Sequence, residues 1–296
     1  MANAKLRQTL ENGGMVVAPG SYDVPTARLA EELGFEFLYV GGNQTGTVLG
    51  TTEPLTTVTQ MADVGRTVAR ACREELPVIL DAGTGFGDPV HVMYAVEALE
   101  AAGVTAIHIE DQTYPKRASY HKGLEHVVPM DVYQARLEYA LKARKSKDFL
   151  IIGRNDGFRA VPDPWLPQGG GREEAVRRAH AAMEVGVDAI MIIGVNQKED
   201  FHYFRSQIKN IPMVALAGSS ELGVPDFEAA GHQIVIYPSS TIQASLRAIF
   251  NLYDHLLRTG VLPEEIGDTR ELMTLGHNLT RLPEKWAVEE EIGHNT

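Results

Sequence analysis

Short apolar segments recur along the whole chain, and they constrain its fold more than any other feature. They are rich in β-branched residues and nearly continuous in apolar character, which is typical of strands buried on both faces. The eight segments are MVVAPG (15–20), FEFLYVGG (35–42), PVILDAG (77–83), TAIHIED (105–111), FLIIGRND (149–156), AIMIIGV (189–195), PMVALAG (212–218) and HQIVIYPSS (232–240).

Amphipathic helical patterns separate these segments. The clearest are DVPTARLAEELG (23–34), DPVHVMYAVEALEAAG (88–103), MDVYQARLEYALKARK (130–145) and GREEAVRRAHAAMEVG (171–186). Strands that alternate with helices in a chain of 296 residues favour a (β/α)8 barrel. We therefore expect a barrel domain over residues 1–258 and a helical extension over 259–296, whose apolar side chains need a surface on the barrel or on a neighbouring subunit.

A doubly wound parallel sheet is the alternative fold. It is disfavoured because no Gly-x-Gly-x-x-Gly follows the first strand segment. The glycine-rich stretch GTGFG (83–87) follows the third segment instead, and its spacing does not match that fingerprint.

Composition excludes several classes of protein. A formal net charge of −12 opposes binding to nucleic acid. The single cysteine, Cys72, cannot form an internal disulfide or a cysteine-built metal site, which suits a reducing compartment. No apolar run approaches the roughly 20 residues that span a bilayer, and the first residues lack a signal-peptide core. We expect a soluble, cytoplasmic protein with neither a membrane nor a nucleic-acid partner.

Charged side chains follow three neighbouring strand segments. Asp81, Glu110–Asp111 and Arg154–Asn155–Asp156 all lie at strand ends, which meet at one mouth of a barrel. Crowded carboxylates need a cation to offset their repulsion, and Mg²⁺ prefers oxygen ligands. Arg154 is suited to hold a substrate carboxylate in a bidentate contact. Two structural alternatives stay open: Asp111 and Asp156 as helix N-caps, and Arg154 as a partner of either aspartate.

Two loops at the same predicted mouth carry further candidates. The stretch GGNQTGTVLGTTE (41–53) is rich in Gly and Thr and offers backbone N–H groups to an anion. The stretch QTYPKRASYHKGLEHVV (112–128) carries basic and aromatic side chains and suits a loop that closes over a substrate. The alternative for the second stretch is an exposed, solvated basic loop.

Taken together, these motifs resemble the isocitrate lyase / phosphoenolpyruvate mutase superfamily. The resemblance extends from about residue 15 to residue 258. It rests on PGSYDVPTARL (19–29), VILDAGTGFGDP (78–89), IEDQTYPKR (109–117), IIGRNDGF (151–158) and IVIYPSS (234–240). It implies a (β/α)8 barrel whose last helix swaps between subunits, with a dimer of dimers as the expected assembly.

The resemblance also implies roles for individual residues. Asp81 corresponds to the principal Mg²⁺ ligand, with Mn²⁺ as a substitute ion, and Glu110 and Glu53 correspond to supporting acids near the metal. Arg154 corresponds to the clamp on the substrate carboxylate. The other implied substrate contacts are the backbone cradle at Thr45 and Gly46 and the gating-loop residues Lys116 and Arg117.

Departures from the superfamily pattern narrow the expected activity. Gly83 replaces the second aspartate of the metal motif, and Ala118 replaces the catalytic cysteine of isocitrate and methylisocitrate lyases. Gly194 stands where the superfamily has a glutamate, and its asparagine falls in the segment Ala215–Leu216. True isocitrate or methylisocitrate lyase activity is therefore not expected.

The expected function is that of a Mg²⁺-dependent lyase. It would cleave, or in reverse form, a C–C bond next to an α-oxo carboxylate through a metal-stabilised enolate. Decarboxylation needs no protein acid for bond cleavage, whereas a retro-aldol reaction of a 2-hydroxy acid needs a base, for which Tyr120 and His121 are the candidates. The alternatives are a P–C bond hydrolase or mutase on a phosphonopyruvate-like compound, and a barrel that binds carboxylates without chemistry.

Overall fold

The computed structural model describes residues 4–117, 121–122, 126–218, 221–267 and 270–293. Tyr120 and Ala118, two of the positions singled out above, therefore lie outside the described residues. The chain divides into two compact units, Met1–Thr241 and Ile242–Thr296, and each is described by itself.

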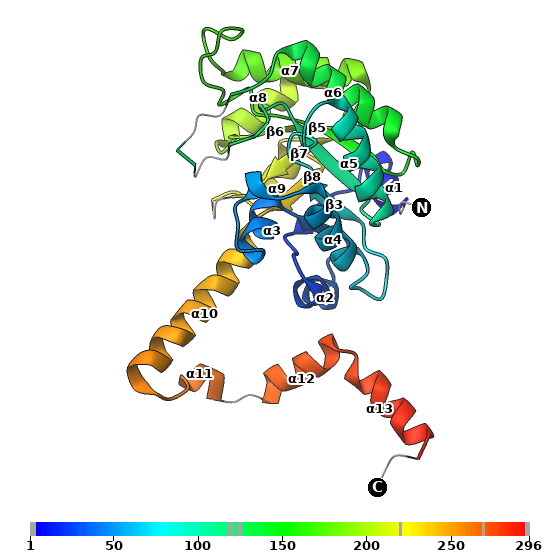
Figure 1. The fold of residues 1–296 in the computed structure, drawn as a ribbon, viewed down its shortest axis with the longest axis vertical. Coiled ribbons are helices and arrows are strands. Elements are labelled where there is room, and N and C mark those ends of the chain that lie inside the picture. The colour runs from blue at the N-terminus through cyan, green and yellow to red at the C-terminus, as the bar shows by residue number, and fades with distance from the viewer. Residues whose placement is uncertain (1–3, 118–120, 123–125, 219–220, 268–269, 294–296) are drawn as a thin grey trace. The chain divides into compact units, whose positions relative to one another are not determined.

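Eight parallel strands form the sheet of the first unit, in the order β1-β8-β7-β6-β5-β4-β3-β2. Figure 1 shows strands of this sheet among the surrounding helices. A parallel bridge between Gly20 and Tyr39 joins the two outer strands, so the sheet closes into a barrel. The predicted (β/α)8 barrel is confirmed. The strands are β1 Val16–Pro19, β2 Leu38–Val40, β3 Val78–Asp81, β4 Ala106–Glu110, β5 Leu150–Asn155, β6 Ala189–Ile192, β7 Met213–Leu216 and β8 Ile234–Tyr237.

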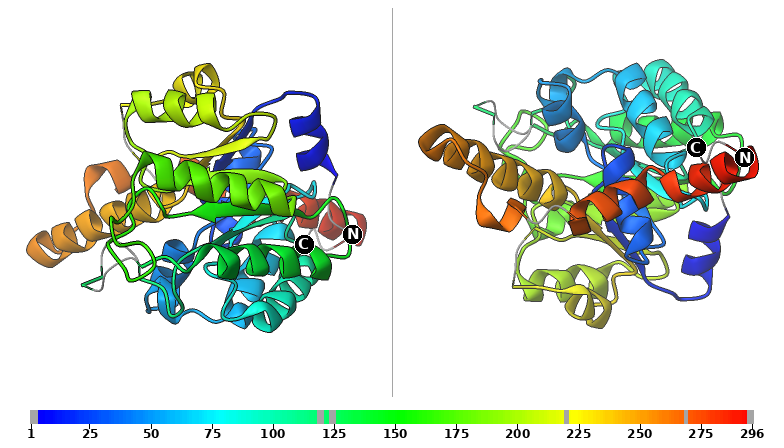
Figure 2. Two further views of the ribbon diagram at one scale, coloured as in Figure 1. Left: turned by 90° about the horizontal axis from the view of Figure 1, so that it is seen from above. Right: turned by 90° about the horizontal axis from the view of Figure 1, so that it is seen from below.

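Helices surround these strands, as the two views in Figure 2 show. The four helices predicted from sequence are α2, α5, α6 and α7, and each lies within the predicted range. The helical segments are α1 Lys5–Glu11, α2 Val24–Glu32, α3 Gly42–Val48, the 3₁₀ helix η1 Glu53–Leu55, α4 Val58–Ala69, α5 Pro89–Ala101, α6 Met130–Ala143, α7 Arg172–Val185, α8 Lys198–Gln207 and α9 Val224–Ala229.

Local sequence explains where the predicted helices begin and end. Asp88 caps α5, because its side chain accepts hydrogen bonds from the backbone of Val90 at 3.1 Å and His91 at 3.2 Å. Gly186 ends α7 in a left-handed conformation with φ of 95°, which glycine adopts without a steric cost.

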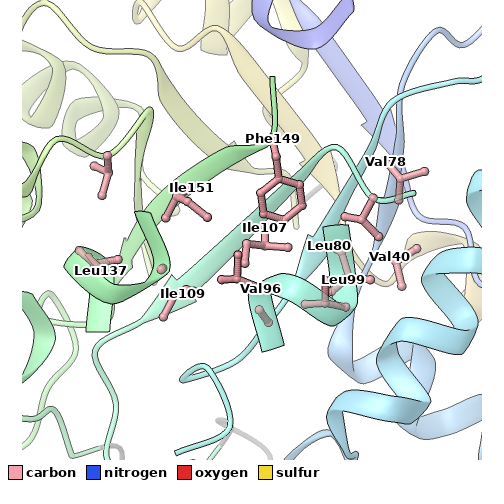
Figure 3. Packing of buried hydrophobic residues seen from close by; sticks show 14 of the residues in the cluster. Val40, Val78, Leu80, Val96, Leu99, Ile107, Ile109, Leu137, Phe149 and Ile151 are labelled. Atoms are coloured by element: carbon pink, nitrogen blue, oxygen red, sulfur yellow. The ribbon is translucent and has the colours of Figure 1, made fainter. Parts of the chain in front are cut away.

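Apolar side chains fill two layers on opposite faces of the sheet. Inside the barrel, alternate strand residues such as Ile79, Ile152 and Met191 form one buried cluster together with Leu6 and Leu10 of α1. The other residues of each strand face the helices (Figure 3). Those labelled in this outer layer are Val40, Val78, Leu80, Val96, Leu99, Ile107, Ile109, Leu137, Phe149 and Ile151. Because both faces are buried, the strands are apolar throughout rather than alternating.

The second unit consists of helices with few buried side chains. They are most of α10 Ser240–Thr259, then α11 Glu264–Gly267, α12 Arg270–Leu279 and α13 Leu282–Glu291. Helix α10 exposes Leu246, Phe250, Tyr253 and Leu257, and it buries Ile242. None of the helices that the structure describes is both long enough and apolar enough for a membrane span.

Candidate active site

The register of three neighbouring strands brings the predicted site residues together. Asp81 at the end of β3 pairs with His108 of β4, and Glu110 at the end of β4 pairs with Arg154 of β5. Because the strands are parallel, their carboxyl ends lie at the same mouth of the barrel. The predicted grouping of Asp81, Glu110 and Arg154 is therefore what the barrel produces.

A cavity of about 460 Å³ opens beside these residues. One side of it carries charged groups from β3, β5 and the loops after β2 and β4. The other side is an apolar wall formed by the ends of β6 and β7 with α8 and α9. The apolar wall consists of Ile193, Val195, Phe201, Leu216, Leu222 and Phe227.

Arg154 is the electrostatic centre of the charged side. Its Nη2 lies 2.8 Å from Glu110 Oε2, its Nε lies 3.1 Å from Asp156 Oδ2, and its Nη1 lies 3.7 Å from Asp81 Oδ2. The backbone at Arg154 is held in turn, because the Tyr133 hydroxyl donates to the Arg154 carbonyl oxygen at 2.8 Å. The guanidinium is therefore fixed among three carboxylates, and its Nη1 has the longest of these contacts.

Lys116 supplies a second buried cation. Its ammonium forms an ion pair with Glu53, and it lies 2.9 Å from Glu110 Oε1. The side chain is only 7% exposed, although the sequence placed it in a gating loop that contacts substrate. The structure thus uses Lys116 to join the loop after β4 to η1, because an ammonium this deeply buried needs carboxylate partners.

The two central acids have opposite pKa shifts. Burial raises the pKa of Glu110 to about 7, although Arg154 and Lys116 oppose the shift. Burial also acts to raise the pKa of Asp81, but Lys116 and Arg154, with a hydrogen bond from Gly83 N, hold it below its usual range. Asp81 is thus an anion at neutral pH, whereas Glu110 takes up a proton more readily than an exposed glutamate does.

His108 and Tyr39 form a neutral layer beneath the charged groups. Burial lowers the pKa of His108 to about 4, so its ring is uncharged even though Nδ1 lies 3.6 Å from Asp81 Oδ1. Its Nε2 and the Tyr39 hydroxyl are 2.9 Å apart. Neither residue was singled out from the sequence, because Tyr39 and His108 lie in the middle of β2 and β4 rather than at a strand end.

Asp111 and Asp156 are not the helix N-caps that were considered as an alternative. The N-caps of α6 and α7 are Pro129 and Gly171. Asp111 lies 3.0 Å from Arg178 of α7 and accepts a hydrogen bond from Asp156 N at 2.8 Å, which ties the loop after β5 to the barrel. Asp156 binds Arg154, so the ion pair considered as an alternative for Arg154 does form.

A divalent cation fits the charge of this group. We define the acidic cluster as Glu53, Asp81, Glu110 and Asp156, whose four formal negative charges face the two cations Lys116 and Arg154. Neither contact of Glu110 with these cations has hydrogen-bond geometry, so both of its buried oxygens retain acceptor capacity. Asp81 and Glu110 are the residues that could hold the ion.

The protein would supply only a few ligands to a divalent cation here. Among the described residues, no three His, Cys, Asp or Glu side chains stand close enough to form a complete cage. Mg²⁺ commonly keeps several waters and uses one or two carboxylates, so a sparse set suits it.

The predicted loop residues lie around the cavity in different ways. Thr45 and Gly46 belong to α3, where Thr45 N donates to Gly41 O at 3.1 Å, and the neighbouring cavity wall is formed by Gly41, Gly42 and Asn43. Arg117 lines the cavity. His121 is half-buried and does not belong to the set of described residues that line it.

Arg159 also lines the cavity, and the sequence analysis did not identify it. It stands in the turn after β5, where Arg159 N donates to Asp156 O at 3.0 Å. The only usable signal was its position five residues after Arg154.

Comparisons with known proteins agree with this architecture. The sequence profile of the phosphoenolpyruvate phosphomutase family matches residues 6–257. The 2-methylisocitrate lyase of Aeropyrum pernix is 36% identical over 262 residues, which are 86% of this chain and 80% of that protein. The 2,3-dimethylmalate lyase of Eubacterium barkeri is 34% identical over 261 residues, 86% of this chain and 85% of that protein.

One of the similar solved structures contains a bound ligand and a metal ion. The phosphonopyruvate hydrolase crystallised with oxalate and Mg²⁺ has a TM-score of 0.81 and 27% identity, with 98% of this chain and 99% of that chain covered. The profile match spans most of the chain, and two relatives exceed 30% identity over most of its length. The chain belongs to the phosphoenolpyruvate phosphomutase family, within the isocitrate lyase / phosphoenolpyruvate mutase superfamily.

Proposed function

We propose that the chain is a carbon–carbon lyase acting on a small α-oxo or 2-hydroxy carboxylate. The observation that carries the proposal is the contact of Arg154 with Asp81, Glu110 and Asp156 at the wall of a cavity of about 460 Å³. The two sequence relatives above carry the names of C–C lyases, which supports the same class of reaction.

Arg154 would bind the substrate carboxylate. Its Nη1 lies 3.7 Å from Asp81, which is ion-pair distance but too long for a hydrogen bond, so this nitrogen is the arm best placed for a ligand. The contacts of Nη2 and Nε with Glu110 and Asp156 would hold the guanidinium in position. A fixed cation of this kind stabilises negative charge without reorganising during the reaction.

Mg²⁺, or Mn²⁺ in its place, is the proposed cofactor, held by Asp81 and Glu110 with Glu53 nearby. When bound, it would supply positive charge for the negative charge that develops on the oxo oxygen as the bond breaks. Lys116 balances Glu53 and Glu110 from the other side. The proton transfers of a retro-aldol reaction stay a prediction for Tyr120 or His121, since Tyr120 lies outside the described residues and His121 is not among the described residues that line the cavity.

Gly83 offers a test of the metal that does not depend on turnover. A Cβ built at this residue would lie 3.9 Å from Lys116 Nζ, and the φ of +52° is a conformation that Asp and Asn tolerate best after glycine. We expect Gly83→Asp to bind Mn²⁺ about tenfold more tightly than Gly83→Asn, which has the same shape without the charge. Equal affinities, measured by electron paramagnetic resonance, would contradict a metal seated at Asp81.

The competing proposal is cleavage or migration of a P–C bond. The family profile and the phosphonopyruvate hydrolase structure favour it. Against it, Lys116, which could otherwise bind a phosphonate, is engaged with Glu53 and Glu110.

A substrate panel separates the proposals. The protein is incubated with 2-oxo diacids, alkyl-substituted 2-hydroxy diacids and phosphonopyruvate, with Mg²⁺ or with excess chelator. Release of a 2-oxo acid or CO2 that requires Mg²⁺ supports the lyase, and release of phosphate supports P–C cleavage. Oxalate binding without any turnover would indicate a barrel that only binds carboxylates.

We also propose that the chain is a homo-oligomer, with a dimer of dimers as the expected form and swapping of the last helix as the expected mode. Helix α10 exposes apolar side chains at helical spacing, including Leu246 at 50%, Phe250 at 64% and Leu257 at 88%. Such a face needs a covering surface in water. A monomer in sedimentation equilibrium at micromolar concentration would contradict this assignment.

A further inference from the structure

We propose that the apolar wall is the binding site for an uncharged alkyl group on the part of the substrate that does not react. The inference deepens the proposed function and rests on it, because it assumes that the carboxylate end of the same molecule binds at Arg154. Its basis is that the apolar wall and the charged side line one cavity of about 460 Å³.

The apolar wall has an accessible front and a buried support. Val195, Leu216 and Leu222 are half-buried, and each lines the cavity. Phe201 and Phe227 also line it, but they are only 4% and 2% exposed. Their rings meet edge to face with centroids 5.0 Å apart. The half-buried side chains are therefore the ones that a ligand would contact, and the two rings hold them from behind.

The apolar wall is continuous with the hydrophobic core, so its shape does not depend on a ligand. Val195 and Leu222 pack against one buried cluster, which consists of Phe201, Ala215, Ala217, Phe227, Ala230 and Val235. A polar ligand group placed on this surface would lose hydrogen bonds to water and gain none from the apolar side chains. An alkyl group has no such bonds to lose, and its burial is favourable.

Two glycines follow the strands that border the apolar wall, and they differ in the space around them. A Cβ built at Gly194 would lie 2.1 Å from Arg159 Cδ and 2.4 Å from its Cγ, so methylene groups of Arg159 cover the end of β6. Among the described residues, a Cβ built at Gly218 would meet only Leu216 Cδ2, at an ordinary contact distance of 3.7 Å. The end of β7 therefore has room for one added methyl group.

The chemistry of the two sides defines the class of ligand. On the charged side, Arg154 Nη1 lies 3.7 Å from Asp81 Oδ2 and is the arm proposed for a carboxylate. On the apolar side, none of the six wall residues carries a charge or a polar side-chain atom. A 2-oxo or 2-hydroxy acid with an alkyl substituent satisfies both sides at once.

A matched pair of ligands tests the assignment without turnover. N-propyloxamate and N-(2-hydroxyethyl)oxamate keep an oxo oxygen beside a carboxylate, but an amide nitrogen replaces the carbon next to the oxo group. They differ only in that a terminal methyl group replaces a hydroxyl group. We expect the wild-type protein with Mg²⁺ to bind the propyl compound about tenfold more tightly. Calorimetry gives both dissociation constants.

Variants at the end of β7 locate the preference. Leu216→Asn puts a polar side chain of similar size on the wall and is expected to reduce the preference to about threefold or less. Leu33→Asn, at a leucine that is 77% exposed after α2, is the matched control and should keep it. Gly218→Ser should lower the preference and Gly218→Ala should not, although both add a side chain of similar size. This second pair decides the matter if circular dichroism shows that Leu216→Asn does not fold.

The results separate this inference from the proposed function. Unsubstituted oxamate, which has no alkyl group, reports on the charged side alone. If it binds with Mg²⁺ but the propyl compound has no advantage, or if the folded wall variants keep that advantage, the alkyl site is overturned. If no oxamate binds, the proposed function fails, and saturation-transfer NMR with 1-butanol tests the wall by itself. A wild-type signal that is at least halved in the folded wall variant supports the alkyl site, whereas equal signals or no signal overturn it.

Discussion

The two sides of the cavity occupy equivalent positions in the barrel and have opposite chemistry. The ends of β3, β4 and β5 carry Asp81, Glu110 and Arg154, whereas the ends of β6 and β7 lead into the apolar wall. On the charged side, each group is held by a partner of opposite sign. On the apolar side, position depends on packing, as in the edge-to-face contact of Phe201 with Phe227 at 5.0 Å between ring centroids.

This difference separates two tasks within one fold. Under the proposed function, the charged side binds and polarises the part of the substrate that reacts, because its cations and anions are fixed and buried. The apolar side can select the part that does not react, because its contacts depend on shape and alkyl content. The comparison predicts that substitutions on the two sides affect different measurable quantities.

The largest effect is expected from Arg154→Gln. The substitution removes the charge shared by Asp81, Glu110 and Asp156, and kcat/KM should fall by about 10³-fold or more. Steady-state kinetics on the substrate found by the panel gives the value, and Lys142→Gln, which changes an exposed lysine on α6, is the control. A fall of less than tenfold would show that Arg154 is an architectural residue.

Lys116→Met tests whether the charged side is stable without its second cation. The variant leaves Glu53 and Glu110 facing each other in a buried site, which should lower the free energy of unfolding by about 3–5 kcal/mol. Mg²⁺ should then raise the melting temperature of the variant more than that of the wild type, because the ion takes over the charge balance. An equal or smaller shift in calorimetry would place the ion away from these carboxylates.

Phe201→Ala tests the apolar side. Phe201 is 4% exposed and contacts both Phe227 and His232, so the cavity left behind should cost about 3 kcal/mol in unfolding free energy. Among substrates, kcat/KM should fall more for alkyl-substituted compounds than for unsubstituted ones. Tyr94→Ala, at a position 60% exposed on α5, is the control and should change neither quantity. A uniform loss across substrates would mean that the wall does not select alkyl groups.

A smaller, pH-dependent effect on the free energy of unfolding is expected from His232, which lies behind the apolar wall against Phe201. Burial, and then Arg205, lower the pKa of His232 to about 4 from 6.5. The unfolded chain therefore binds the proton first as pH falls, so this residue lowers the free energy of unfolding as pH falls from about 6.5 to 4. We expect the wild type to lose about 1–2 kcal/mol more than His232→Gln between pH 7 and pH 5.

Urea denaturation at the two pH values measures this loss. His91→Gln is the control, because His91 is an exposed histidine on α5. An identical pH dependence in wild type and His232→Gln would show that the ring is not held neutral behind the wall.

The sequence alone determined the barrel and much of its charged mouth. The recurrence of short, nearly continuous apolar segments identified the strands. Because the carboxyl ends of parallel strands share one face of a barrel, Asp81, Glu110 and Arg154 could be grouped without coordinates. These predictions succeeded because each depends on local pattern and on a rule of topology.

Only the tertiary structure decided which side chains are partners. Lys116 reaches Glu53 across 63 residues of sequence, Arg178 reaches Asp111 across 67, and Arg159 occupies the space above Gly194. Such contacts depend on how loops from different strands turn back over the mouth and on which rotamers the packing allows. Local sequence pattern specifies neither the loop paths nor the rotamers. The partner that stabilises a buried charge comes from another part of the chain.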